Sequence, residues 1–286
     1  MPHPESYEDL IRVIHECFED MSKSYQKMAV YLTQNPNDAA VMSLTTIAKA
    51  CGVHASGFVR FAQSLGYSGF KELQLVLQKR LATAAPGFEA RVRALEEELG
   101  GKEGEGSVGY LRDLVRRDIA SLQHLHANTP AESIQQAAEM LDAAECVYLI
   151  GQLRSAPIVE LLRYVLTMLG KRTVLLDASG GLATHMAKTS RTTDLLLAVS
   201  FRFYATEVVN VVEETAKRGV PILAITDSTL SPLAKSATLL FSVPEHEYTF
   251  SRSLAAPMCL AQALTVAFAA RVQNAQKPRI PVVTQP

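Results

Sequence analysis

Five short apolar runs recur through the second half of this 286-residue chain, at 147–150, 173–176, 195–199, 221–225 and 238–243. Helical patterns lie between the first four, at 156–169, 181–188 and 205–218. Runs that are short, unbroken and joined by helices predict strands buried on both faces of a parallel sheet. We therefore expect an α/β doubly wound domain with a five-stranded parallel sheet, preceded by a helix at 131–144 and closed by one at 254–272.

The loops that follow these strands hold candidate effector-binding residues, because doubly wound sheets bind ligands beyond the carboxyl ends of their strands. Hydroxyls and backbone amides that open a helix suit an anion, and Arg154 and Arg202 offer forked partners for a carboxylate or phosphate. The alternative is that these hydroxyls only cap helices. The candidates are Gly151, Gln152, Arg154 and Ser155 after the first strand, Ser200, Arg202, Tyr204, Thr206 and Glu207 after the third, and Thr226 and Ser228 after the fourth.

The stretch at 44–63, LTTIAKACGVHASGFVRFAQ, predicts two short helices joined by a tight turn. Small Ala48 lets the helices approach each other, and Gly52 suits the left-handed conformation that ends the first one. The second helix is expected to begin near residues 54–56. This is the pattern of a helix-turn-helix, whose second helix enters a major groove, although other helical hairpins share the spacing.

Charge supports the DNA-binding interpretation. Residues 21–82 hold seven Lys or Arg and two Asp or Glu, a net charge of 7 − 2 = +5 in a chain of formal net charge −1. Such a basic excess is expected of a surface that contacts phosphates, although a solvated helical face can also be basic. A helix at 5–20 is acidic and is expected to point away from DNA. Another helix runs from 22 to a break at 35–37, so residues 1–84 form an all-α helix-turn-helix domain.

Residues 85–109 predict a linker, because GGKEGEGSVG has glycine at nearly every second place. The α/β domain is assigned to 110–273, and residues 274–286 are expected to form a disordered tail. A helix at 110–126 is a candidate for dimerisation. Packing on its own domain explains its periodicity equally well.

Composition limits the classes of protein to which the chain can belong. Hydrophobic residues make up 48% and charged residues 20%, as in ordinary soluble proteins. We identify no apolar run near the ~20 residues that span a bilayer and no export signal, so we expect a cytoplasmic protein without a membrane partner. The four cysteines lie far apart without a C-x-x-C motif, which predicts buried thiols and neither zinc nor disulfides.

Enzyme motifs are absent. The chain has no dinucleotide-binding glycine motif, no Walker lysine and no nucleophile elbow, so we expect no catalytic residue, no metal and no cofactor. Acid–base chemistry in an isomerase is the alternative. Its candidates are His185, Glu207, His246 and Glu247.

With these motifs in place, the chain resembles the RpiR-type family of bacterial transcriptional regulators, which join a helix-turn-helix domain to a sugar-isomerase (SIS) domain. IAKACGV and VRFAQSLGYSGFKEL resemble the first domain, and AITDSTLSPLA resembles the segment around the fourth strand. The resemblance extends over most of the chain. It implies a homodimer or homotetramer that binds an operator in double-stranded DNA, with a SIS domain that senses a phosphorylated sugar or related metabolite without isomerase chemistry.

If the positions of the family's recognition helix are carried over to this sequence, the resemblance implies that residues 53–60 lie in the DNA groove. His54 replaces the Ser usual in the family, and Gly57 replaces the usual Thr, so capping and base contacts are expected to differ. The implied DNA-binding residues are Lys49, His54, Ala55, Ser56, Arg60, Gln63 and Lys71.

The effector loop departs further from the family. Arg202, Phe203 and Ala205 replace the second Ser, the Gly and the Thr of the phosphate-binding pattern Ser-x-Ser-Gly-x-Thr, and Leu153 replaces a second Gly after the first strand. We expect a bulkier, aromatic pocket in which Arg202 pairs with a carboxylate or phosphate. The chain is thus interpreted as a repressor of a carbohydrate or central-carbon operon, controlled by a sugar phosphate or sugar acid. Alternatives are a SIS-domain sugar-phosphate isomerase and a metabolite-binding module that acts through protein partners.

Overall fold

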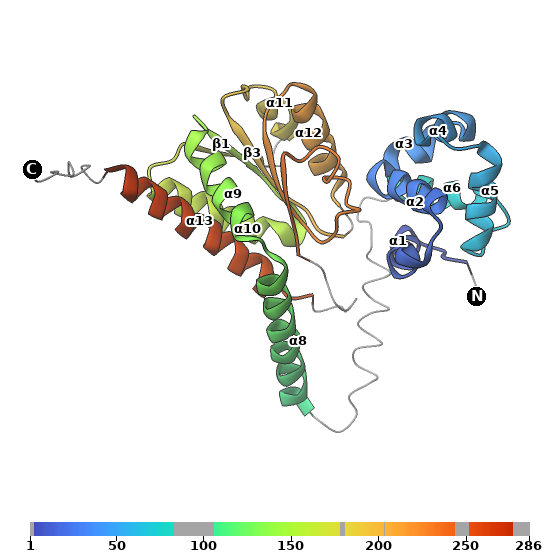
Figure 1. The fold of residues 1–286 in the computed structure, drawn as a ribbon, viewed down its shortest axis with the longest axis horizontal. Helices are drawn as coiled ribbons and strands as arrows, with labels where there is room; N and C mark the ends of the chain where they lie inside the picture. Colours follow the sequence, from blue (N-terminus) through green and yellow to red (C-terminus); the bar gives the residue numbers. More distant parts are fainter. Residues whose placement is uncertain (1–2, 83–105, 178–180, 203, 244–251, 277–286) are drawn as a thin grey trace, which may run out of the picture.

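The computed structural model describes residues 3–82, 106–177, 181–202, 204–243 and 252–276. A helical domain forms the N-terminal part, and an α/β domain forms the second half (Figure 1). Most of the predicted linker, 83–105, and most of the predicted tail, 277–286, lie outside the described residues.

The helical domain places its apolar faces around one core, where Leu10, Met28, Phe58 and Phe61 are almost fully buried. The predicted break at 35–37 is confirmed, because a helix ends at Gln34, but the short helix that begins at Pro36 was not predicted. Proline suits a first helical turn, where its missing N–H is not needed. The elements are α1 (Tyr7–Cys17), the 3-10 helix η1 (Phe18–Asp20), α2 (Lys23–Gln34), α3 (Pro36–Val41), α4 (Leu44–Cys51), α5 (Ala55–Ser64) and α6 (Phe70–Ala82).

The α/β domain contains one parallel sheet in the order β2-β1-β3-β4-β5, which confirms the predicted doubly wound class. Every residue of β1, β3 and β4 is buried, because helices cover both faces. The elements are α8 (Gly106–Asn128), α9 (Ala131–Ala143), β1 (Val147–Ile150), η2 (Leu153–Ser155), α10 (Ala156–Met168), β2 (Thr173–Leu175), α11 (Ala183–Ala187), β3 (Leu195–Val199), α12 (Thr206–Lys217), β4 (Ile222–Thr226), β5 (Leu239–Ser242) and α13 (Ala255–Gln276).

Strand order reverses between β1 and β3, which lie side by side with β2 beyond β1 and β4 beyond β3. The loops after β1 and β3 therefore diverge at this point, where doubly wound folds bind ligands. Helices α9, α10 and α13 pack on one face of the sheet and α11 and α12 on the other. This arrangement brings the candidate effector loops to one edge.

The helix boundaries differ from the predicted domain limits. Helix α8 begins at Gly106, inside the predicted linker, and α13 continues to Gln276, into the predicted tail. No Gly or Pro occurs between Pro257 and Pro278, so the sequence offers nothing that stops α13 earlier.

The 20 residues Ala255–Asn274 contain an 18-residue stretch with a mean hydropathy of 1.4, enough by length and composition to cross a membrane. The prediction that no apolar run approaches the length needed to span a bilayer did not take this stretch into account. Within the structure, Leu260, Leu264 and Phe268 of this helix are buried in the core against α9 and α10. A core position accounts for these three apolar residues, whereas Val266 of the same helix is 68% exposed.

All four cysteines are free, but the prediction of buried thiols is correct only for Cys146. Cys51 is half-buried, and Cys17 and Cys259 are exposed. Apolar periodicity indicates which helix face tends to be buried. It does not tell how far the neighbouring elements extend over that face.

Candidate DNA interface and effector site

The turn between α4 and α5 has the predicted helix-turn-helix geometry. Gly52 takes the left-handed conformation (φ 65°, ψ 38°), and its N–H bonds back to the carbonyls of α4. Ser43 caps the start of α4 by accepting from the N–H of Thr46 at 3.2 Å. His54 occupies the equivalent position before α5, but its side chain makes no capping bond. The departure from the family at His54 therefore removes one cap.

Gly57 lies where α5 packs on α2. A Cβ atom built at Gly57 would lie 2.7 Å from Cε of Met28, closer than real contacts allow. Met28 thus fills the space that a larger side chain on α5 would need. This packing explains how the chain accommodates glycine at a position where the family usually has Thr.

The predicted DNA-binding residues are all at least partly exposed in the helical domain. Lys49, His54, Ser56, Arg60, Gln63 and Lys71 are exposed, and Ala55 is half-buried. They lie on α4, on the turn, on α5 and at the start of α6. Figure 1 shows α5 on the side of the helical domain away from the α/β domain, so the sheet does not cover it.

The loop after β1 is shaped by two special backbone positions. A Cβ at Gly151 would lie 2.9 Å from Cγ1 of Val159 and 3.2 Å from the carbonyl oxygen of Val199, so this position requires glycine. Leu153 has φ 55°, a left-handed conformation that favours glycine. The backbone thus keeps the shape expected of the family's second Gly although a leucine occupies it.

Several predicted effector residues bond to each other or to the backbone. Gln152 donates to the carboxylate of Glu207, and the guanidinium of Arg154 lies 5.0 Å from the ring centroid of Phe201 and donates to the carbonyl of Ser253 at 3.3 Å. Ser228 accepts from the N–H of Leu230 at 3.0 Å, a bond within the turn after β4, where no helix follows in the described residues 227–238.

Arg202 lies beside a carboxylate that the sequence analysis did not select. Its Nε is 3.9 Å from Oδ2 of Asp227, and the exposed fractions of the two side chains are 11% and 2%. Tyr204 lies next to them; burial, and then the Asp227 carboxylate, raise the pKa of its phenol. An Asp directly after a buried strand was an available signal for this cluster.

The remaining predicted residues lie at the end of β4 or in the segments that follow β1 and β3. Ser155, Ser200 and Thr226 are buried, and Thr226 donates its hydroxyl to Asp227 at 3.3 Å. Thr206 begins α12, half-buried. With Phe201 also buried, the edge of the sheet at β3 and β4 is bulky and aromatic rather than an open ring of hydroxyls.

His15 of α1, in the helical domain, also contacts this cluster electrostatically. Burial lowers the pKa of its imidazole, the Arg202 guanidinium lowers it further, and the Asp227 carboxylate opposes the shift. Its Nε2 is buried and has no hydrogen-bond partner within the described ranges. No pattern in the sequence indicated that this residue of the first domain would approach the second.

Two of the four isomerase candidates, His185 and Glu207, lie among the described residues. His185 is exposed on α11, and Glu207 is bonded to Gln152. His246 and Glu247 lie outside the described residues. In the part of the chain that the structure describes, no group of three or more His, Cys, Asp or Glu could hold a metal ion.

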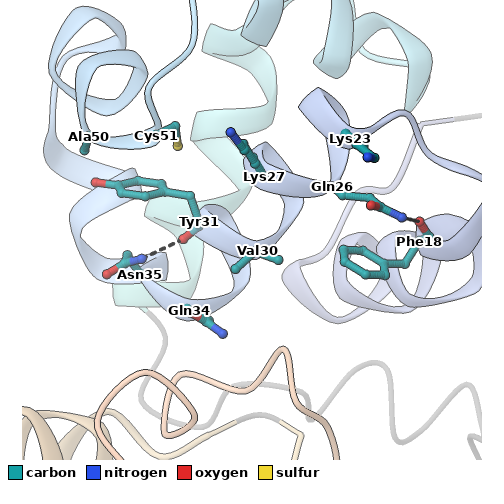
Figure 2. Close-up of a pocket in the computed structure, with 10 residues that line it drawn as sticks. All are labelled: Phe18, Lys23, Gln26, Lys27, Val30, Tyr31, Gln34, Asn35, Ala50 and Cys51. Carbon is teal, nitrogen blue, oxygen red and sulfur yellow. Dashed lines mark hydrogen bonds between the residues drawn. The ribbon is translucent and has the colours of Figure 1, made fainter.

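A groove of about 580 Å³ lies on the helical domain between α2 and α4 (Figure 2). Its lining residues are Phe18, Lys23, Gln26, Lys27, Val30, Tyr31, Gln34, Asn35, Ala50 and Cys51. Burial raises the pKa of the Cys51 thiol to about 11, so the thiol is protonated and unreactive near neutral pH. Figure 2 shows Gln34 directed toward the α/β domain.

The fold and the two sites define a class, a helix-turn-helix protein with a SIS-type α/β domain. Residues 9–84 match the helix-turn-helix domain of the rpiR family, and residues 140–267 match the SIS domain. The chain belongs to the RpiR family of transcriptional regulators, as the motifs predicted.

Two named relatives span most of the chain. It is 27% identical over 246 residues to the HTH-type transcriptional regulator HexR of Pseudomonas aeruginosa, which covers 84% of this chain and 81% of HexR. It is 29% identical over 253 residues to the HTH-type transcriptional regulator YfhH of Escherichia coli K12, covering 88% and 86%. Both relatives are named as transcriptional regulators rather than enzymes.

Two solved structures are similar in fold. The sugar isomerase domain of an RpiR transcription factor from Sphaerobacter thermophilus is 30% identical with a TM-score of 0.54, and the match covers 57% of this chain and 90% of that one. The Vibrio vulnificus NanR protein complexed with ManNAc-6P is 20% identical with a TM-score of 0.53, and the match covers 93% of both chains. At that identity the second similarity shows the fold.

Proposed function

We propose that this regulator is a cytoplasmic repressor of a carbohydrate or central-carbon operon. Its α5 helix binds the operator, and a sugar phosphate or sugar acid bound at the edge of the sheet near Arg202 relieves repression. The observation that carries the DNA-binding part is the exposed polar face of α5, on which Ser56, Arg60 and Gln63 point away from the core. The similar NanR structure, which holds a phosphorylated sugar, supports the class of effector.

DNA binding is tested with the duplex upstream of the chain's own gene. Arg60→Ala should weaken specific binding by about 1–3 kcal/mol and relax base preference at one position, because Arg60 is proposed to contact a base edge. Lys71→Ala should weaken binding to all sequences and lower the slope of log affinity against log salt by about one, because a lysine on phosphate releases one counterion.

Lys188→Ala is the matched control for these variants, because Lys188 is an exposed lysine of the α/β domain. It should bind DNA as the wild type does. Equal binding of the Arg60→Ala and wild-type proteins to the specific duplex would remove α5 from the DNA interface.

Effector binding is tested by calorimetry with ManNAc-6P, glucose 6-phosphate and 6-phosphogluconate. The guanidinium of Arg202 is the proposed anion partner, because planar guanidinium groups pair with carboxylates and phosphates through two parallel bonds. Arg202→Ala should abolish binding of the best compound, whereas His185→Ala should leave it unchanged. Wild-type affinity in Arg202→Ala would refute this role.

Self-association is proposed to use α8. Val108, Leu111, Val115 and Ile119 recur on one side of this helix, and between 49% and 62% of each residue is exposed. A stripe with spacings of three and four residues fits against the same stripe of a second copy, as in antiparallel or parallel helix pairs. A two-fold homodimer would set two α5 helices against a symmetric operator.

Sedimentation of the Leu111→Glu/Val115→Glu variant tests the dimer. The two carboxylates should make the protein monomeric, because they would be buried without partners in the interface. Val41→Glu, which alters another exposed apolar residue, should leave the wild-type mass. A dimer that survives the α8 substitutions would exclude this helix as the interface.

A further inference from the structure

Polar contacts between described residues join the two domains. Lys235 donates from Nζ to Oδ1 of Asn35 at 2.6 Å, and Gln34 donates from Nε2 to the carbonyl of Thr229 at 3.2 Å. Asn37 also approaches Asn210, at 3.5 Å. These bonds are exposed to water, and bonds of this kind contribute little because water competes for the same groups. These three bonds therefore add little to the cost of opening the junction.

Helix α1 extends this junction to the candidate effector cluster. The charged groups that shift the pKa of His15 are Arg202 and Asp227, and Tyr7 contributes to the raised pKa of Tyr204. Tyr7 is 3% exposed and Tyr204 2%. Helix α1 thus interacts electrostatically with the groups that follow β3 and β4.

The docked helical domain leaves little room for a ligand at Arg202. Only 11% of the Arg202 side chain is exposed, and Nε2 of His15, which interacts electrostatically with Arg202, is itself buried. We propose that docking of α1 and binding of an anionic effector at Arg202 exclude each other, so that the effector releases the helical domain from the α/β domain. This inference rests on the proposed effector site.

The exclusion links the two functions of the chain. Helix α5 faces away from the junction, so docking leaves it open to DNA (Figure 1). In a dimer, docked helical domains hold both α5 helices at one spacing, and release removes that constraint. The effector shifts the balance because it has affinity for the released arrangement and none for the docked one.

Hydrogen exchange of the full chain tests the exclusion, with inorganic phosphate as the probe and sodium chloride holding ionic strength constant. Phosphate should slow exchange in residues 200–207 and 226–228 and speed it in α1 and in 229–235, with one half-saturating concentration. Protection of the strand ends without faster exchange in α1 would show that anion binding and docking of α1 do not exclude each other. It would still support the effector site. No change in either region would count against both.

Lys235→Ala supplies a second test, because it removes a bond across the junction without touching the strand ends. It should speed exchange in α1 before phosphate is added and lower the half-saturating phosphate concentration by about three-fold, since an exposed contact of this kind contributes less than ~1 kcal/mol to docking. Lys188→Ala should do neither. A half-saturating concentration that is unchanged or higher in Lys235→Ala would contradict the competition.

Discussion

Nε of Arg202 lies 3.9 Å from Oδ2 of Asp227, and 11% and 2% of these two side chains are exposed. The residues follow adjacent strands, β3 and β4, whose parallel register brings both loops to one edge of the sheet. Two opposite charges that are buried in this way stabilise the fold only when both are present, because the attraction between them compensates the cost of desolvating each one.

Removal of one member should therefore be more harmful than removal of both. Asp227→Ala should lower the free energy of unfolding by about 3 kcal/mol, since it leaves a buried guanidinium without its carboxylate. Urea unfolding followed by circular dichroism measures this loss. The Arg202→Met/Asp227→Ala double variant should recover part of it; a double variant that loses the sum of the two single effects would show that the pair is not coupled.

Acidification should weaken the folded, docked form through His15. Its pKa lies below the ordinary value of 6.5 mainly because the side chain is buried and next because Arg202 is nearby, with Asp227 opposing. The folded form therefore prefers neutral imidazole. The stability that neutral His15 provides is complete above about pH 6.5 and is lost as pH falls through the lowered pKa.

Urea midpoints from about pH 7.5 to about pH 5.5 measure this effect in the wild type and in His15→Gln, which cannot titrate. The wild type should lose more stability on acidification than the variant. Parallel pH profiles would mean that His15 does not contribute to the pH dependence.

His54→Ser should stabilise the helical domain by about 1 kcal/mol, because serine would cap the N–H groups that open α5 whereas His54 forms no such bond. Thermal unfolding provides the measurement. Ser43→Ala, which deletes the existing cap of α4, is the matched control and should cost about the same amount. An unchanged melting temperature in His54→Ser would show that other groups already satisfy these donors.

Leu153 should respond to substitution according to backbone conformation rather than burial, because it is 70% exposed at φ 55°. Leu153→Val should destabilise by at least about 1 kcal/mol, since β-branched residues fit left-handed backbone poorly. Leu153→Gly should be neutral or stabilise by about 0.5 kcal/mol, after the greater flexibility of unfolded glycine is subtracted. Chemical denaturation distinguishes the two variants, and equal losses would refute the strain at this position.

Local features were predictable wherever a few neighbouring residues decide the structure. Gly52 indicated the left-handed end of α4 because only its own backbone is involved, and the five apolar runs indicated strands because both faces of the sheet bury them. The short helix α3 was missed, since proline both ends one helix and begins the next. The last turn of α13 was missed, although no Gly or Pro stops the helix before Pro278.

The sequence by itself determined the two domains, the helix-turn-helix, the parallel sheet and the loops in which a ligand site would form. Only the tertiary structure decided that Arg202 pairs with Asp227 and that His15 from the other domain approaches both. Periodicity reports which side of an element is buried, whereas these contacts depend on which elements meet in space. Residues far apart in the chain carry no local signal of such a meeting.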